Sequence, residues 1–186
     1  MNFAIVDLEC TSLKADQGFL LCGGFKPLGK PPYVVGLHKV GCEPGSRLTI
    51  DRKLALAIRA EVEKYDVIVG WNSKMFDIPF LNTRLLLCKE QPLHRPRHID
   101  AMYYARQGQS TLTSSRLDWV SRQYVEKARK TALDLAVWKE AEAEALSRFK
   151  GGHKNYDYIV DHCLKDLIVT EEVYERIKPL VASITR

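Results

Sequence analysis

One short strand that carries two acids constrains the fold of this chain more than any other segment. The sequence Phe3-Ala-Ile-Val-Asp-Leu-Glu is mostly apolar and predicts a buried strand. Its acids, Asp7 and Glu9, are two residues apart and therefore project from the same face of the sheet. Two carboxylates about 4 Å apart repel each other by roughly 4 kcal/mol at an effective dielectric constant near 20. The pair needs a cation or a shared proton, unless the end of the strand is exposed and both acids are solvated.

The remaining apolar patterns predict one mixed α/β sheet with flanking helices. The expected strands are 3–9, 18–25, 33–37, 67–71 and 99–104, and the expected helices are 51–65, 79–88, 113–125, 132–149 and 156–177. Asp51 is positioned to cap the first of these helices, and Pro79 opens the second in its first turn. The length of 186 residues favours a single domain, residues 1–186, with one substantial core.

Charge and cysteine content narrow the class of protein. Lys and Arg number 28 against 23 Asp and Glu, which gives a formal charge of +5. This excess suits a polyanionic partner if the site itself is acidic, because the basic residues then gather around its rim. The five cysteines are odd in number and no pair has C-x-x-C spacing, which favours buried free thiols over a zinc ribbon or a disulfide framework.

The sequence predicts an intracellular protein that is not secreted, located in the cytoplasm, nucleoid or nucleus, with no membrane partner. No apolar run approaches the roughly 20 residues that span a bilayer. The apolar stretch 3–6 runs straight into acids and lacks the preceding basic region of a signal peptide.

A basic stretch lies between the expected helix 79–88 and the strand that follows it. His94, Arg95, Arg97 and His98 fall there. These residues either line a path for nucleic acid or belong to an ordinary exposed loop, and the sequence favours neither interpretation.

A third acid, Asp77, follows the expected strand 67–71. A polar turn separates the two, and Asp77 stands just before the helix that Pro79 opens. Sites in open α/β sheets gather beyond the carboxyl ends of the strands, and the helix dipole favours an ionised carboxylate there. Asp77 therefore binds a ligand or caps the helix, and its two oxygens allow it to do both.

The last expected helix carries a fourth acid. At 100° per residue the apolar side chains of 156–174 fall on one broad arc that should face the sheet. His162 and Asp166 lie about 40° apart at one edge of that arc, whereas Asp157 and Asp161 point elsewhere. Considered alone, this helix favours a surface Asp–His pair over a functional site.

Together, Asp7, Glu9, Asp77 and Asp166 form a candidate metal site, with His162 beside the last acid. Hard oxygen ligands select Mg²⁺ or Mn²⁺ over zinc. Two such ions about 3.5–4 Å apart can clamp the attacking and leaving oxygens of a phosphodiester. We therefore predict two divalent cations, Mg²⁺ or Mn²⁺, as cofactors.

At these residues the sequence resembles the DEDD (DnaQ-like) superfamily of 3′→5′ exonucleases, whose fold is ribonuclease H-like. The first motif, with its D-x-E core, is matched by Asp7-Leu8-Glu9-Cys10-Thr11-Ser12-Leu13. The second, in the version of family B DNA polymerase proofreading domains, is matched by Asn72-x-x-x-Phe76-Asp77-x-Pro79-x-Leu81. The place of the third is taken by His162-Cys163-Leu164-Lys165-Asp166. The order and rough spacing agree along nearly the whole chain, which implies a three-layer fold with a central mixed sheet of about five strands.

The resemblance also implies a reaction. A terminal phosphodiester of a single strand with a free 3′ end is hydrolysed by in-line attack of an activated water, and nucleoside monophosphates are released. Asp7 is implied to bridge both ions, Glu9 and Asp166 to complete one ion site, and Asp77 to support the other.

Substrate contacts are implied at three further positions. Thr11 would contact the terminal sugar through its backbone, and Asn72 and Phe76 would hold or stack on the last bases. Core packing accounts for Phe76 equally well. Asp100 is similar in placement to an acid on the fifth strand of the family, and a structural role is favoured for it.

His162 departs from the family pattern. The tyrosine branch has Tyr four residues before the last Asp, and the histidine branch has His five residues before it, whereas His162 stands at the tyrosine spacing. An imidazole can be a general base at neutral pH, whereas tyrosine mostly orients the attacking water. We therefore assign His162 a role in water activation, with Tyr158 as an outside alternative.

Three readings of the function stay open at this point. A DNA substrate is favoured because the second motif resembles that of the polymerase group. Nothing in the sequence shows whether the protein senses a 2′-hydroxyl, so an exoribonuclease is the main alternative. The other rival is a nucleic-acid-binding or adaptor domain without catalysis, against which the survival of four mutually repelling acids argues. The protein either acts alone or serves a polymerase or repair complex.

Overall fold

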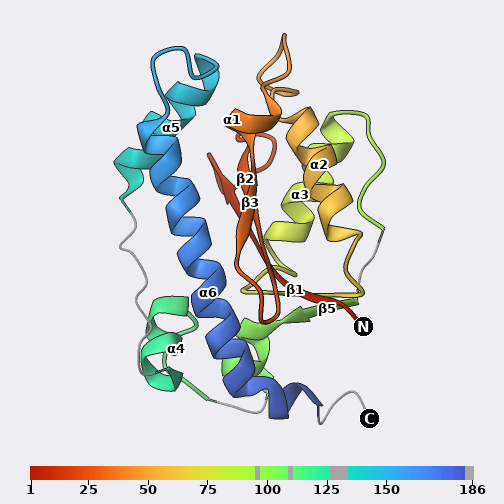
Figure 1. The fold of residues 1–186 in the computed structure, drawn as a ribbon, viewed down its shortest axis with the longest axis vertical. Helices are drawn as coiled ribbons and strands as arrows, with labels where there is room; N and C mark the ends of the chain where they lie inside the picture. Colours follow the sequence, from red (N-terminus) through yellow and green to blue (C-terminus); the bar gives the residue numbers. More distant parts are fainter. Residues whose placement is uncertain (95–96, 109–110, 126–133, 183–186) are drawn as a thin grey trace.

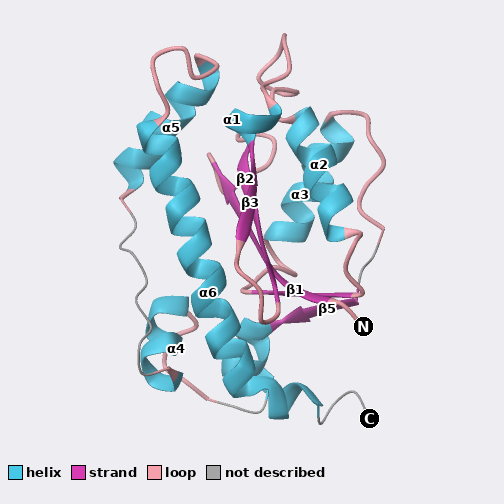
Figure 2. Cartoon of the chain, in the orientation of Figure 1, coloured by secondary structure: helices cyan, strands magenta, loops and turns pink. Residues whose placement is uncertain are grey.

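The computed structural model describes residues 1–94, 97–108, 111–125 and 134–182. The elements in chain order are β1 (Phe3–Cys10), β2 (Leu20–Pro27), β3 (Tyr33–Gly36), α1 (Leu37–Val40), α2 (Arg52–Val62), β4 (Val67–Gly70), α3 (Asp77–Leu87), β5 (Arg97–Asp100), the π-helical η1 (Tyr103–Gly108), α4 (Leu117–Tyr124), α5 (Leu135–Leu146) and α6 (Lys154–Ala182). Figure 1 shows α2 and α3 on one side of the strands and α5 and α6 on the other. The strands, magenta in Figure 2, form the layer between them.

β1 is the middle strand of a five-stranded mixed sheet with the order β3-β2-β1-β4-β5. It is antiparallel to β2 and parallel to β4, while β2 and β3 are antiparallel and β4 and β5 parallel. The mixed sheet and its flanking helices confirm the α/β fold class predicted from the sequence. Since the parallel strands end at the same edge, the end of β1 lies beside the turn that follows β4.

Neighbouring glycines of β2 let the two helical layers approach the sheet closely. A Cβ atom at Gly23 would lie 2.7 Å from the Ile58 side chain of α2, and one at Gly24 would lie 2.5 Å from the Cys163 sulfur of α6. The two faces of the sheet are therefore covered by different helices. Asp7 is the register partner of Gly24, so its side chain is on the α6 face.

Several boundaries differ from those expected. The strand expected at 99–104 is β5, which ends at Asp100 because that carboxylate accepts a hydrogen bond from the N–H of Met102 at 3.2 Å and the chain turns there into helix. The helix expected at 79–88 begins at Asp77, and the one expected at 113–125 begins at Leu117. The last helix continues through Pro179.

The helix expected at 132–149 is the shorter α5, and residues 132–133 lie outside the described part of the chain. After α5 the residues Arg148 and Phe149 have φ angles of 57° and 59°. These left-handed values cannot continue a right-handed helix. Among the described residues, no helix has both the length and the apolar character that crossing a membrane requires.

A buried ion pair holds α2 and α3 together. Nε and Nη2 of Arg84 donate to the Asp51 carboxylate at 2.9 and 2.6 Å, and the N–H of Leu20 donates to it at 2.8 Å. Arg84 also donates to the carbonyl oxygens of Ala15 and Leu48. Asp51 occupies the N-cap position of α2, but its side chain makes no capping hydrogen bond. The predicted capping role is therefore wrong, because the carboxylate is used by Arg84 and β2 instead.

We expect Arg84→Met to lower the free energy of unfolding by about 3–5 kcal/mol, because it leaves Asp51 buried without its counter-charge. Urea denaturation followed by circular dichroism measures this loss. The control Lys64→Met removes an exposed ion pair with Glu61 and should cost less than about 1 kcal/mol. Equal losses in the two variants would contradict a central role for the buried pair.

Candidate metal centre

Asp7 and Glu9 lie on the face of β1 that α6 covers. Their carboxylate oxygens and the sulfur of Cys163 all lie within 4.8 Å of one another. Both acids are partly buried. The pair is thus held against a helix, and the alternative of two solvated acids at an exposed strand end does not describe it.

Asp77 reaches back from α3 to β1. Its Oδ1 accepts a hydrogen bond from the N–H of Leu8 at 2.8 Å, and the residue is 3% exposed. Burial raises the pKa of Asp77 to about 7, against the effect of the Leu8 hydrogen bond and with a further contribution from Asp100. Phe76 occupies the N-cap position of α3. The third carboxylate is therefore fixed beside the strand segment that carries the first two.

α6 brings the fourth acid and the histidine to the sheet. His162 and Asp166 are 3% and 7% exposed, and His162 Nε2 lies 3.7 Å from Asp166 Oδ2. The Trp138 ring of α5 packs edge-on against the His162 ring, with centroids 5.4 Å apart. The interpretation of this pair as a surface pair is wrong, because α6 turns it inward. Asp161 and Tyr158 are exposed on the outer side of the helix.

The pKa of Glu9 is raised by its burial and by the charges of the other three acids. Burial raises it well above its usual value, and the charges of Asp7, Cys22, Asp166 and Asp77 raise it further. The structure thus places the carboxylates of Asp7 and Glu9 within 4.8 Å of each other, and the charges of Asp77 and Asp166 act on Glu9 from α3 and α6. Uncompensated charges at this density are unfavourable, and a bound cation would relieve that cost.

Cys163 is a member of this cluster to which the sequence analysis gave no role. It lies inside the third motif, but its place on the apolar arc of the helix indicated a core residue. A hydrogen bond with Cys22 and burial raise the pKa of its thiol well above the usual value. A protonated thiol is a weak metal ligand, so the useful donors are carboxylate oxygens. This donor set fits hard divalent cations better than zinc.

Trp138 was also missed. It lies on α5, far from the motifs in sequence, and no spacing pattern connects it with His162. Its contact with the imidazole arises from the packing of α5 against α6.

The turn between β4 and α3 is held by β5. Asp100 accepts hydrogen bonds from the N–H groups of Asn72 and Lys74 at 3.0 and 3.1 Å, in agreement with the structural role expected for it. Asn72 has a φ of 59°, a conformation that asparagine tolerates better than most residues. The Phe76 ring packs near Phe80, with centroids 5.6 Å apart, and against the core. Core packing therefore accounts for the position of the Phe76 ring. Base contacts by Asn72 and Phe76 stay predictions.

Thr11 lies directly after β1. Its N–H donates to the carbonyl of Phe19 at 3.0 Å, and its hydroxyl oxygen accepts from the N–H of Phe19 at 3.1 Å. The backbone donor is therefore already used within the protein, and contact of Thr11 with a terminal sugar stays a prediction.

The basic stretch before β5 does not behave as one unit. His94 and Arg97 are exposed, whereas Arg95 lies outside the described residues. His98 is half-buried, with Nε2 2.7 Å from the hydroxyl of Ser73, and burial lowers its pKa to about 4. His98 therefore supports the turn after β4 instead of lining a surface path.

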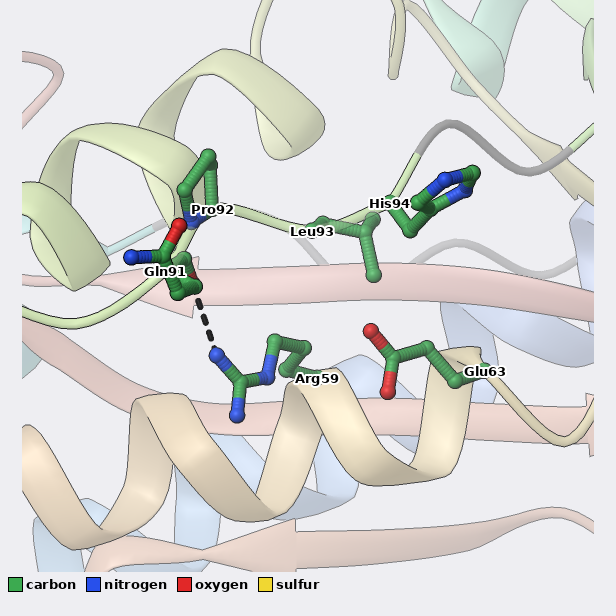
Figure 3. Close-up of a pocket in the computed structure, with 6 residues that line it drawn as sticks. All are labelled: Arg59, Glu63, Gln91, Pro92, Leu93 and His94. Atoms are coloured by element: carbon green, nitrogen blue, oxygen red, sulfur yellow. Dashed lines mark hydrogen bonds between the residues drawn. The ribbon is translucent and has the colours of Figure 1, made fainter.

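A hollow of about 590 Å³ lies next to this stretch, between the end of α2 and the segment after α3. Figure 3 shows its lining and the hydrogen bond of 2.7 Å from Arg59 to the carbonyl of Gln91. The lining residues are Arg59, Glu63, Gln91, Pro92, Leu93 and His94. None of the four acids contributes to it, so the hollow is separate from the candidate metal centre.

Comparisons with known proteins agree with this arrangement. The family model of the RNase H superfamily matches residues 4–178. Among solved structures, the chain is similar to the family B DNA polymerase from the hyperthermophilic archaeon Pyrobaculum calidifontis, with a TM-score of 0.66 and 18% sequence identity. The match covers 97% of this chain and 25% of the polymerase, so the chain spans about a quarter of that protein's length. No curated protein matches the sequence significantly.

The chain belongs to the RNase H superfamily. It has the ribonuclease H-like fold that the motifs implied, and this is a nuclease-type fold. Nucleases with this fold generally use divalent cations, in agreement with the close pair of carboxylates, Asp7 and Glu9, on β1.

Without divalent ions, we expect Asp7→Asn to raise the free energy of unfolding by about 1–3 kcal/mol, because it removes one charge that faces Glu9. With Mn²⁺ we expect the wild type to be more stable than Asp7→Asn. The wild type gains stability by binding the ion, about 2.7 kcal/mol at a concentration 100 times the Kd, whereas the variant loses this gain.

Thermal melting in EDTA and in Mn²⁺ measures both effects. The matched control is Asp161→Asn, which removes an exposed acid paired with Lys165 on the same helix. This control should change neither the stability in EDTA nor the stabilisation by Mn²⁺ appreciably. An Asp7→Asn protein that Mn²⁺ stabilises as strongly as the wild type would rule out a shared cation site at Asp7. One that is less stable in EDTA would contradict the repulsion between Asp7 and Glu9.

Proposed function

We propose that residues 1–186 form a single exonuclease domain that hydrolyses terminal phosphodiesters from the 3′ end of single-stranded DNA and releases nucleoside monophosphates. The observation that carries this proposal is the close pair Asp7 and Glu9 on β1, with Asp77 hydrogen-bonded to the same strand and the charges of Asp77 and Asp166 raising the pKa of Glu9. Membership of the RNase H superfamily supports nuclease chemistry.

Two divalent cations, Mg²⁺ or Mn²⁺, are the proposed cofactors. Asp7, Glu9 and Asp166 would hold one, and Asp7 and Asp77 the other. When bound, the two cations supply positive charge that stabilises the attacking and leaving oxygens of the phosphodiester. The protein contributes the position of these ligands. Asp77 in particular is held by the N–H of Leu8, and that hydrogen bond sets its place beside Asp7.

His162 is the proposed general base. Its Nε2 is directed toward Asp166, and Trp138 packs against the ring, so the orientation of the imidazole is restricted from two sides. In the proposed reaction Nε2 accepts the proton of the attacking water. Asp166 then favours the protonated imidazole through its negative charge.

DNA is the preferred substrate in this proposal, and the terminal nucleotide would be held by Thr11, Asn72 and Phe76. The second motif resembles that of polymerase proofreading domains, and the similar solved structure is that of a DNA polymerase. An exoribonuclease on the same fold is the alternative, and it predicts faster cleavage of RNA than of DNA. A polymerase or repair complex is a candidate partner.

A set of single- and double-stranded DNA and RNA, labelled at either end and incubated with Mg²⁺ or Mn²⁺, tests the activity directly. We expect 5′-labelled single-stranded DNA to shorten stepwise and 3′-labelled DNA to release labelled mononucleotide at once. Asp7→Ala should abolish cleavage, while Asp161→Asn should cleave at the wild-type rate. A wild-type protein that neither cleaves any substrate nor gains stability with Mn²⁺ would instead be a non-catalytic binding or adaptor domain.

His162→Ala should lower the cleavage rate about 10²–10⁴-fold if the imidazole is the base, because the attacking water then lacks its proton acceptor. Single-turnover kinetics on 5′-labelled DNA measure this. Stabilisation by Mn²⁺ should persist in the variant, since the four acids are intact. Near-wild-type rates would remove His162 from the mechanism.

A further inference from the structure

A cluster of aromatic rings lies at the start of α6, where α1 meets the α5–α6 connection. The His38 ring lies 4.1 Å from the His153 ring and 4.8 Å from the Phe149 ring, measured between centroids. Phe149 in turn lies 5.1 Å from Tyr156, which is buried. His38 is exposed, and Phe149 and His153 are partly exposed. Figure 1 shows α1 and the α5–α6 connection at the same end of the molecule.

Exposed cations adjoin these rings in the sequence. Lys39 follows His38, Arg148 and Lys150 flank Phe149, and Lys154 follows His153. We call the three solvent-accessible rings (His38, Phe149, His153) and these four cations the aromatic-basic face.

The acids close to this face are already engaged. Asp157 lies 2.8 Å from Nδ1 of His153, and Glu144 accepts hydrogen bonds from the N–H groups of Asn155 and Tyr156 at 3.1 and 2.8 Å. The four cations outnumber these two acids, so the residues named here carry a net positive charge.

The segment that presents Phe149 has an unusual backbone. Arg148 and Phe149 both have left-handed φ angles, which are unfavourable for bulky side chains. Strained conformations of this kind are often kept for a function. Here they occur at the exposed Arg148 and at Phe149, which packs against the core and stays partly exposed.

The face lies within reach of the candidate metal centre on two routes. Along α6, His153 is nine residues before His162 and 13 before Asp166, or about 14–20 Å at 1.5 Å per residue. Across the sheet, Glu9 is the register partner of Cys22, and Cys22 is the partner of Gly36, which directly precedes α1. Two strand spacings of about 4.8 Å separate Glu9 from Gly36.

We propose that the aromatic-basic face binds the single-stranded DNA substrate several nucleotides before the 3′ end that is held at the metal centre. This inference rests on the proposed function. Rings that stack on bases, set among cations that contact phosphates, are the chemistry by which proteins hold single strands without sequence preference. At about 3.4 Å per stacked nucleotide, a separation of 14–20 Å corresponds to roughly four to six nucleotides.

The dependence on substrate length follows from this separation. A substrate of about three nucleotides fills the metal centre without reaching the face, whereas one of about 12 nucleotides contacts both. Variants of the face should therefore weaken the binding and cleavage of the long substrate and leave the short one unchanged.

The test uses a triple variant, Lys39→Gln with Lys150→Gln and Lys154→Gln, measured by fluorescence anisotropy with single-stranded DNA in EDTA. The control is Lys53→Gln with Lys89→Gln and Lys178→Gln, which removes the same charge from exposed positions elsewhere. We expect the first variant to bind the long oligonucleotide at least about tenfold more weakly, with a salt slope lower by about 2, and the control to change less than about twofold.

Phe149→Gly tests the ring separately, because glycine adopts the left-handed φ without strain and the backbone is kept. Loss of one stacked base should weaken binding of the long oligonucleotide about 5- to 150-fold. The proposal is overturned if the two triple lysine variants bind the long oligonucleotide with the same affinity, whether or not that affinity is below the wild type's. It is also overturned if Phe149→Gly does not weaken binding.

Cleavage rates with Mn²⁺ separate this inference from the proposed function. If the wild type cleaves both lengths and the lysine variant is as fast as the control on the long one, the exonuclease proposal stands and the docking face is wrong. If no substrate is cleaved but binding still depends on the face, the docking face stands and the exonuclease proposal fails.

Discussion

The burial of mutually repelling carboxylates is the constraint on which the rest of this structure depends. Asp7 and Glu9 face α6, which lies close to the sheet. The close approach is possible because Gly24 carries no side chain, so that Cys163 and Leu167 pack directly on the sheet. The close approach raises the pKa of Glu9, since the acids lose water and gain one another's charge. Such an arrangement costs stability in the free protein and becomes favourable when cations are bound.

The scaffold fixes Asp77 and the helix that carries it through several contacts. Leu8 donates its N–H to Asp77, and Asp100 holds the turn from which α3 starts. The buried Arg84–Asp51 pair then ties α3 to α2 and β2. These contacts come from different elements, and together they resist the repulsion that would otherwise drive the acids apart.

α6 links the two proposed functions of this protein. Its middle carries His162 and Asp166 to the sheet, and its first residue, Lys154, follows directly on His153 of the aromatic-basic face. A strand held at both places would run along the helix, with its terminal phosphodiester at the acids and its earlier bases on His38, Phe149 and His153. The positive charge of the chain would then serve a rim around an acidic centre, as its composition suggested.

Local patterns in the sequence were sufficient for the fold class and the sheet strands, because each strand depends on residues close together along the chain, whereas the choice of the four acids also needed the resemblance of three distant motifs and stays a prediction. The alternation in β1 put Asp7 and Glu9 on one face of the sheet, but the arc of α6 placed Asp166 only at its edge and favoured a surface pair, which the burial of Asp166 shows to be wrong. Tertiary structure alone decided what those residues touch. The Asp51 side chain pairs with Arg84 instead of capping its helix, His98 turns to Ser73, and Trp138 meets His162. These contacts join residues 24 to 33 positions apart in the sequence. They depend on how the helices pack on the sheet, which no local spacing encodes.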